Sequence, residues 1–455
     1  MNMDWDKLFC EKRERESKTT KYSYRNCFDM DYDRIVYSSS LRRLQDKAQV
    51  FPLQENDFTR TRLTHSLEVS AIGRSIGANV GCKLKEKNIF DEKKERKLSS
   101  LMLVTGLVHD LGNPPFGHYG EDVIKKWIKK HKHKLQLDDD FGGTISDFEK
   151  FDGNAQTIRI LTRLQFLNDK YGMNFCYGTL ATLMKYPWNS TECPKNKDKF
   201  GYFYSEKELC ENIVKETGII KRHPATYLLE AADDIAYLFA DLEDALKKHY
   251  LPWNKVLNIF KTELKNNDYF NTKMDSIVQN KSDIELSQME LDLISVQNFK
   301  IYVQGFFIQV VCDEFIENYD SIMNGTYEKE SLLKCHKIVE FERLIRKECI
   351  KYAYNNSEVL SLELVCEEVL TNLLDKFVFA ALDDENYKNV KHSNGKLYAL
   401  ISENFKHIQY YDENGKYNPN MNLSKYQRLQ MVIDFISGMT DSYALNLHKM
   451  LCGKR

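Results

Sequence analysis

Apolar residues recur along this chain at the three- and four-residue spacing that is typical of amphipathic helices. Residues 38–40 offer serine N-caps ahead of one such run, and Pro224 stands at a first-turn position of another. The pattern predicts a short helix carrying Leu41, Leu44 and Ala48, a helix opened by Arg60, Arg62 and His65, an apolar helix over residues 101–108, and helices over about residues 119–132, 151–166, 173–187, 222–246 and 428–451, the last interrupted by Gly438.

These elements predict an all-α fold with a catalytic N-terminal half and a helical C-terminal half. We expect residues 1–32 to form an amphipathic or loosely ordered lead-in, residues 33–250 the catalytic core, and residues 251–455 a helical lobe packed on that core. Since no low-complexity linker separates the halves, we expect them to be lobes of one unit.

Composition narrows the class of protein. The 455 residues carry a formal net charge of −2, which gives no whole-chain attraction for nucleic acid or an anionic membrane. The 11 cysteines include no CxxC pair, which argues against a disulfide framework and a thiolate zinc site. The charged N-terminus lacks the apolar core of a signal peptide, and no run approaches the roughly 18 apolar residues of a spanning helix. We therefore expect a cytoplasmic protein without a membrane partner.

Candidate chemistry is concentrated in the stretch LMLVTGLVHDLGNPPFGHYGE, Leu101–Glu121. The apolar helix ends in His109 and Asp110, and the following Gly/Pro loop would interrupt any helix interior. Taken alone, a His-Asp pair fits a helix C-cap with a solvated aspartate better than a metal site. Other residues of the chain shift the interpretation from a helix C-cap toward a metal site.

Two imidazoles and two carboxylates make a coherent set of ligands when the chain is taken as a whole. They are His65, the pair His109 and Asp110, and one aspartate of the dipeptide at 233–234. Such a mixed set suits a divalent ion of intermediate softness, and each residue lies on or at the end of a separately predicted helix. The ordered series resembles the signature of the HD-domain metal-dependent phosphohydrolases.

Longer matches make the resemblance more specific. The chain is similar to the bacterial dGTP triphosphohydrolases, which are HD-domain helical bundles that split a deoxynucleoside triphosphate into deoxynucleoside and tripolyphosphate. The matching segments are RRLQDKAQVFPL (42–53), RTRLTHSLEV (60–69), GLVHDLGNPPFGHYGE (106–121), FDGNAQ (151–156), KFGYF (199–203), EAADDIAYLFADLEDA (230–245) and DFISGMTDSYA (434–444). Residues from about 251 to 420 carry no motif of this kind.

The resemblance implies His65, His109, Asp110 and Asp233 as ligands of a divalent metal. Mn²⁺ or Mg²⁺ is expected first, with Co²⁺, Fe²⁺, Ni²⁺ and Zn²⁺ as alternatives. Helical spacing also favours Asp233 over Asp234, because Asp233 shares a helix face with positions 237 and 241.

His118 and Glu121 match the family's second catalytic pair. On its own, a His–Glu pair at i,i+3 is more often an ordinary surface contact. In this position the glutamate is expected to orient the imidazole and raise its basicity, so that the dyad moves protons on the side opposite the metal.

Further residues are implied as substrate contacts. Positive charge and hydrogen-bond donors are needed for a triphosphate, and the matching positions are Arg62, Asn154, Lys185, Tyr186 and Lys199. Tyr237 resembles the ring that packs against the sugar and leaves no space for a 2′-hydroxyl, and Gln49 and Asp241 resemble the partners of the 3′-hydroxyl. Arg428 is expected to reach the site from the C-terminal lobe.

The function implied is a metal-dependent dNTP triphosphohydrolase acting by water attack at the α-phosphorus, with dGTP as the favoured substrate. Two alternatives stay open: an HD-domain phosphatase acting on nucleoside monophosphates or cyclic nucleotides, and a non-hydrolysing nucleotide sensor. The resemblance alone also implies homo-oligomers, a hexamer among them, with nucleotide activation or single-stranded DNA binding in some members. The sequence shows no basic stripe with interleaved aromatic residues that would indicate DNA binding by itself.

Overall fold

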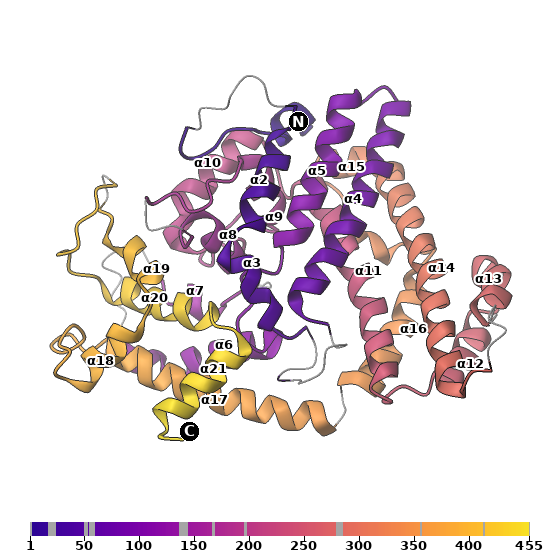
Figure 1. The fold of residues 1–455 in the computed structure, drawn as a ribbon. Helices are drawn as coiled ribbons and strands as arrows, with labels where there is room; N and C mark the ends of the chain where they lie inside the picture. Colours follow the sequence, from indigo (N-terminus) through magenta and orange to yellow (C-terminus); the bar gives the residue numbers. More distant parts are fainter. Residues whose placement is uncertain are drawn as a thin grey trace.

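The computed structural model describes residues 2–16, 24–49, 53, 60–135, 144–165, 169–194, 198–278, 285–354, 357–412 and 415–454. Within these ranges the regular structure is entirely helical, and extended contacts are limited to isolated bridges such as that between Ala48 and Thr61. The predicted all-α class is therefore confirmed (Figure 1). No helix in the described ranges is both long and apolar enough to cross a membrane.

The α-helices run in chain order as α1 (Trp5–Leu8), α2 (Cys27–Val36), α3 (Ser39–Arg43), α4 (Arg62–Glu86), α5 (Glu92–Val108), α6 (Gly117–Leu135), α7 (Ser146–Glu149), α8 (Gly153–Thr162), α9 (Tyr177–Leu183), α10 (Lys207–Thr217), α11 (Pro224–Lys247), α12 (Trp253–Glu263), α13 (Asp268–Val278), α14 (Gln288–Glu317), α15 (Tyr319–Met323), α16 (Val339–Cys349), α17 (Ser357–Ala381), α18 (Ser393–Leu400), α19 (Glu403–His407), α20 (Lys425–Ser437) and α21 (Asp441–Leu451). Shorter 3₁₀ turns are η1 (Leu44–Asp46), η2 (Tyr204–Glu206), η3 (Leu332–Lys334) and η5 (Ile408–Tyr410), and η4 (Ile350–Tyr354) is a π-helical turn.

Several helices begin or end at residues other than those that the apolar periodicity predicts. Helix α8 begins only at Gly153, because the Asp152 side chain accepts a hydrogen bond from the backbone N–H of Asn154 and caps the helix there. The apolar run at the C-terminus is two helices, since α20 ends at Gly438 and the Thr440 side chain caps α21. The short helix predicted through Ala48 ends earlier, and Ala48 pairs instead with the residue that caps α4.

The described part of the N-terminal segment packs into the core, whereas the sequence predicted an amphipathic or loosely ordered lead-in. Trp5 and Leu8 are buried. Arg13 is buried as well, and its guanidinium donates to Asp31 at 2.5 Å and to the carbonyl oxygen of Asn174 at 2.6 Å. Residues 17–23 of this segment lie outside the described ranges.

The centre of the molecule is the antiparallel pair α4 and α5, with α11 packed against both (Figure 1). The two helices approach so closely at Gly106 that a Cβ there would lie 2.7 Å from the Cα of Ser70. The Ser70 hydroxyl donates to the carbonyl oxygen of Leu103 at 2.6 Å across the same crossing. This contact brings the first turn of α4 and the last turn of α5 to one end of the bundle.

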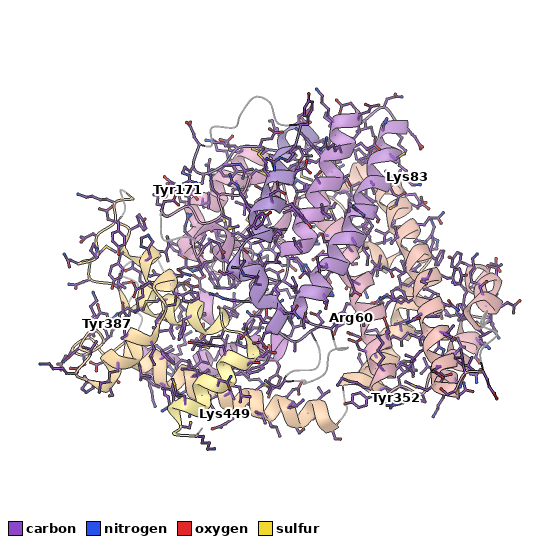
Figure 2. The ribbon with its side chains drawn as sticks, in the orientation of Figure 1. Arg60, Lys83, Tyr171, Tyr352, Tyr387 and Lys449 are labelled. Atoms are coloured by element: carbon purple, nitrogen blue, oxygen red, sulfur yellow. The ribbon has the colours of Figure 1, made fainter. Side chains whose placement is uncertain are left out.

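Arg60 connects that end of the bundle to α11. It precedes α4 at the point labelled in Figure 2 and donates to Glu243 at 2.5 Å and to Asp244. Its pairing with Glu68 at 3.2 Å on α4 completes a partly buried ionic cluster. The start of α4 is thereby held against α11, on which the predicted metal ligand Asp233 lies.

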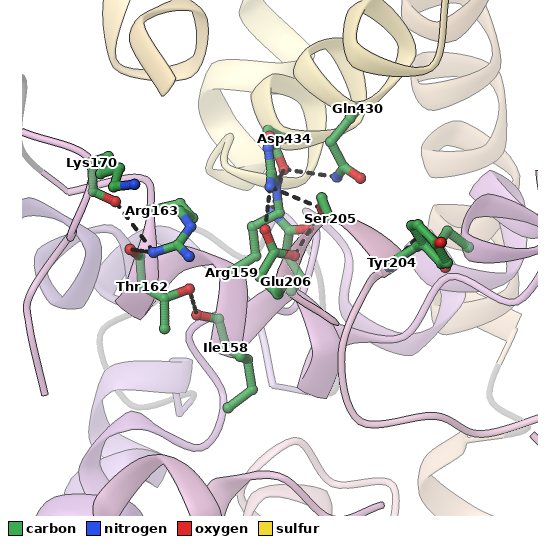
Figure 3. Close-up of polar contacts among 12 residues, drawn as sticks. Ile158, Arg159, Thr162, Arg163, Lys170, Tyr204, Ser205, Glu206, Gln430 and Asp434 are labelled. Carbon is green, nitrogen blue, oxygen red and sulfur yellow. Dashed lines mark hydrogen bonds and ion pairs between the residues drawn. The ribbon is translucent and has the colours of Figure 1, made fainter. Parts of the chain in front are cut away.

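Helices α17, α20 and α21 form a C-terminal body that packs on α6 and α8 (Figure 1). A buried ionic cluster lies at this contact, where Arg159 of α8 donates to Asp434 of α20 at 2.8 Å and to Glu206 at 2.6 Å (Figure 3). Gln156 adds a donor to Asp434 at 3.0 Å. Because removal of one partner would leave an unpaired buried charge, the cluster favours a single packing arrangement of α20 against α8.

Candidate active site

The two predicted histidines and one predicted aspartate meet at the end of the α4–α5–α11 bundle. One ligand atom from each of His65, His109 and Asp233 lies within 4.8 Å of the others. Asp233 Oδ1 is 3.0 Å from His65 Nε2 and 3.4 Å from His109 Nε2. Residues separated by 168 positions in the chain therefore converge on one point.

Asp110 lies beside this group and is held by other partners. Its Oδ1 is 3.5 Å from His109 Nε2 and accepts a hydrogen bond from the side-chain amide of Asn113 at 2.5 Å. Its Oδ2 accepts from Arg62 at 2.6 Å. The carboxylate faces the histidines, but it is outside the compact three-residue group.

Two features of the donor set fit a cation. His109 Nδ1 donates to the carbonyl oxygen of Gly106 at 2.8 Å, which leaves Nε2, 3.4 Å from Asp233 Oδ1, as the ring nitrogen available to a cation. Within the described residues, His109 Nε2 and His65 Nδ1 are buried without a hydrogen-bond partner. Burial lowers the pKa of His109, but the fields of Asp110 and Asp233 outweigh it and raise this pKa to about 9. The pocket therefore favours positive charge.

The neighbouring Asp234 has different surroundings. Its Oδ2 accepts a hydrogen bond from the Ser331 hydroxyl at 3.3 Å, and its Oδ1 lies 3.5 Å from Arg346. Burial and the charge of Asp233 raise the pKa of Asp234 to about 6. The structure thus separates the two carboxylates as the helical spacing predicted, with Asp233 on the histidine side.

His118 and Glu121 form a pair at the start of α6. The Nδ1 atom of His118 is 3.6 Å from Glu121 Oε2, and the ring is 80% exposed to the cavity and solvent. The other carboxylate oxygen of Glu121, Oε1, accepts a hydrogen bond from the backbone N–H of Gly153 at 2.9 Å, which fixes the side chain. The hydrogen-bonding and charge interaction with the adjacent Glu121 carboxylate raises the pKa of His118.

A tight turn sets the direction of His118. Phe116 and Gly117 both have positive φ, 63° and 62°. A Cβ at Gly117 would lie 2.5 Å from the Nη2 atom of Arg62, so glycine favours both the backbone conformation and the close approach of the arginine. Arg62 is thereby placed between the HD pair and His118.

These groups line one cavity of about 720 Å³. A second chamber of about 530 Å³ shares Lys185, Lys199, Asp233 and Asp234 with it. The predicted substrate contacts found in the larger cavity are Gln49, Arg62, Asn154, Lys185, Lys199 and Tyr237, while Tyr186 lines the smaller chamber.

Three predicted site residues lie outside these linings: the buried His65, Asp241 and Arg428. Asp241 is buried on α11, one turn beyond Tyr237. Arg428 is turned into the C-terminal lobe, where it donates to the carbonyl oxygen of Ala381 at 3.0 Å and to Asp384 at 2.5 Å. The expectation that Arg428 reaches the site is not met in this chain, because these partners and the ring of Tyr387 hold its guanidinium.

The structure also adds residues that the sequence did not indicate. Arg346 of α16 lines the cavity beside Asp234, and Lys125, Lys129 and Lys150 line its outer part. Arg346 is held by Glu342 at 2.8 Å. It lies within the stretch that carries no recognisable motif, so no local signal could have identified it.

Comparisons with known proteins show which domains and relatives this chain resembles. The HD domain model matches residues 62–164, and the phosphohydrolase-associated domain model matches residues 414–450. A deoxyguanosinetriphosphate triphosphohydrolase-like protein of Listeria monocytogenes is 37% identical over 99% of this chain and 100% of its own length. A protein of the same description from Synechocystis is 31% identical over 99% of both chains, and the deoxyguanosinetriphosphate triphosphohydrolase of Yersinia enterocolitica is 28% identical over 96% and 95%.

Proposed function

Because this chain belongs to the HD-domain family of deoxyguanosinetriphosphate triphosphohydrolase-like proteins, we propose that it hydrolyses deoxynucleoside triphosphates to deoxynucleoside and tripolyphosphate, with dGTP preferred. The observation that carries the proposal is that one cavity is lined by His109 and Asp233 of the His65–His109–Asp233 group, by the His118–Glu121 dyad and by several cationic side chains. The chain is a hydrolase, and this cavity would serve both metal binding and proton transfer.

His65, His109 and Asp233 would hold a divalent metal, with the adjacent Asp110 as the fourth ligand. When bound, Mn²⁺ or Mg²⁺ supplies Lewis-acid polarisation of a phosphoryl oxygen and of a water. Arg62 contributes by fixing the Asp110 carboxylate at 2.6 Å.

The dyad supplies the proton transfer. His118 stands on the exposed side of the cavity, and its imidazole moves a proton to or from the groups at the α-phosphorus. Glu121 orients the ring and stabilises its charged form, and the Gly153 backbone keeps the glutamate in place. Water attack at the α-phosphorus breaks the bond between this phosphorus and the 5′-oxygen. The 5′-oxygen takes up a proton and leaves as the deoxynucleoside, and the water oxygen stays in the tripolyphosphate.

The cationic side chains would hold the polyanion. Lys185 is tied to Glu230 at 3.7 Å, and the nearby carboxylates raise its pKa despite its burial, so it remains charged. Lys199, Arg62 and Arg346 add charge from three other segments, and Asn154 and Tyr186 add polar contacts. A monophosphate needs far fewer cations, which favours a triphosphate over the phosphatase alternative.

Sugar selection would lie on the face of α11 that follows the metal ligand. Tyr237 lines the cavity one turn after Asp233, so its ring limits the space at C2′. Gln49 is placed nearby, and its buried Oε1 has no hydrogen-bond partner among the described residues. That free acceptor suits a 3′-hydroxyl, with Asp241 as a second partner.

The product profile tests the proposed function. The purified protein is incubated with Mn²⁺ or Mg²⁺ and each of the four dNTPs or GTP, and products are separated by anion-exchange chromatography. We expect deoxynucleoside and tripolyphosphate, fastest with dGTP and slowest with GTP. Release of dNDP or dNMP would contradict attack at the α-phosphorus, and tight dNTP binding without turnover under every metal would favour a sensor.

Glu121→Gln is expected to shift the pH dependence of kcat toward lower pH. The Glu121 carboxylate raises the pKa of His118, so the neutral amide lets that pKa fall. The alkaline limb moves down if the imidazole acts as the acid, and the acid limb moves down if it acts as the base. A profile that moves upward, or does not move, would contradict the electrostatic role of Glu121.

A further inference from the structure

The carboxylate of Asp441 joins two separate backbone segments of the active site. Asp441 is the first residue of α21, is 3% exposed, and belongs to the C-terminal body. Its Oδ1 accepts from the backbone N–H of Phe116 at 2.9 Å, and its Oδ2 accepts from the backbone N–H of Ala48 at 2.9 Å. One side chain therefore satisfies a buried and a partly buried backbone donor that are 68 positions apart.

The first of these donors lies in the turn that presents His118. Phe116 has φ of 63°, a conformation that a bulky residue keeps only when its surroundings hold it. Its N–H precedes His118 by two residues, and the same turn contains Gly117, against which Arg62 packs. The hydrogen bond to Asp441 is thus a direct restraint on the direction of the dyad.

The second donor lies in the segment that presents Gln49. Ala48 precedes Gln49 and forms an isolated bridge with Thr61, the N-cap of α4. The adjacent Arg62 N–H donates to the carbonyl oxygen of Lys47 at 2.9 Å. Asp441 therefore also restrains the segment on which Gln49 and the start of α4 depend.

A second contact of the same body reinforces the first. The Lys47 ammonium is 2% exposed and donates to the carbonyl oxygens of Asn113 at 2.5 Å and Ser437 at 2.9 Å. It thereby connects the Gly/Pro loop after the HD pair with the end of α20. The C-terminal body and the catalytic loop meet through built, buried polar contacts.

We propose that Asp441 is a positioning residue of the reaction, which holds the His118 turn and the Gln49 segment in one register through its two carboxylate oxygens. The proposal rests on the proposed function, because that function assigns His118 and Gln49 their roles. It also gives the C-terminal phosphohydrolase-associated domain a part in building the active site, although none of its residues lines the described cavity. Only a carboxylate provides two acceptors without a donor at this place.

Asp441→Asn is the matched substitution, because it keeps the shape and one acceptor oxygen but turns an NH₂ group toward the other backbone N–H. We expect kcat to fall about 10- to 100-fold, the range that a displacement of about 1 Å can cause, with Mn²⁺ stoichiometry unchanged. In a His118→Ala background, the same substitution should lower kcat by a clearly smaller factor, because the ring whose direction it sets is gone and only the effect through the Gln49 segment remains. An equal loss in both backgrounds would overturn the proposal in favour of a general structural role.

Two control variants separate positioning from attachment of the C-terminal body. Ser442→Ala removes the neighbouring contact to Asp46 at 2.8 Å, and we expect unchanged kcat. Asp434→Asn weakens the buried cluster with Arg159, and we expect a lower Tm with kcat of the folded protein retained. If Asp434→Asn lowers kcat as much as Asp441→Asn does, the effect comes from the whole interface and the proposal fails.

Amide hydrogen exchange gives a readout that needs no turnover. In Asp441→Asn, peptides over residues 112–118 and 44–49 should exchange faster than in the wild type, while peptides over α5 stay protected. Unchanged protection in both segments would overturn the proposal. If the wild type releases no tripolyphosphate from any dNTP, the proposed function fails, and exchange still decides whether Asp441 holds these segments.

Discussion

Replacing His118 with alanine is expected to lower kcat by about 10²- to 10⁴-fold, the usual contribution of a positioned general acid or base, while the metal content stays the same. The ring stands on the cavity side of α6 with its Nδ1 atom 3.6 Å from Glu121. Its ion-pair partner is Glu121, whereas His65 and His109 pair with Asp233. Removing it should therefore remove proton transfer without disturbing the metal group.

The measurement is steady-state kinetics with dGTP, together with metal analysis of the same preparation. His133→Ala serves as the matched control, because His133 is an exposed histidine on α6 that does not line the cavity. We expect the control to retain wild-type kcat. An unaffected rate in His118→Ala would remove the dyad from the mechanism, and loss of metal would place His118 among the ligands.

Asp233→Ala is expected to abolish metal binding and turnover, whereas Asp234→Ala keeps bound metal. Asp233 Oδ1 lies within 3.4 Å of both histidine Nε2 atoms, and its carboxylate is the compact group's only anion. The histidines lower the pKa of Asp233 well below its usual range, in spite of burial. Asp234 faces Ser331 and Arg346 instead, so its loss leaves the group intact.

Thermal unfolding with and without Mn²⁺ measures this independently of catalysis. A ligand that binds only the folded state raises Tm with concentration, so the increase should vanish in Asp233→Ala and persist in Asp234→Ala. Chelation should likewise remove the activity of the wild type, and added Mn²⁺ should restore it. The opposite result for the two aspartates would mean that the assigned helix register is off by one residue.

The sequence determined the local part of this arrangement. Apolar periodicity was enough to predict α4, α11 and the C-terminal half of α5, since the faces that these helices bury repeat at helical spacing. The charged first turns of α5, from Glu92, were not predicted as helix. The same spacing distinguished Asp233 from Asp234, because adjacent residues on a helix point about 100° apart. The prediction that His65, His109 and Asp233 gather at one place depended on the ordered motif, and the structure brings the three together.

Only the tertiary structure decided which distant residues join them. Arg346 enters the cavity from α16, Arg428 turns away to Asp384, and Asp441 reaches back to Phe116 and Ala48. None of these contacts leaves a periodic or local mark in the chain. Each depends on how one helix packs against another. For example, the buried ion pair between Arg159 and Asp434 holds α20 against α8. Local propensity determines the helices, but contacts between residues far apart in the chain are set by packing, and packing is a property of the whole fold.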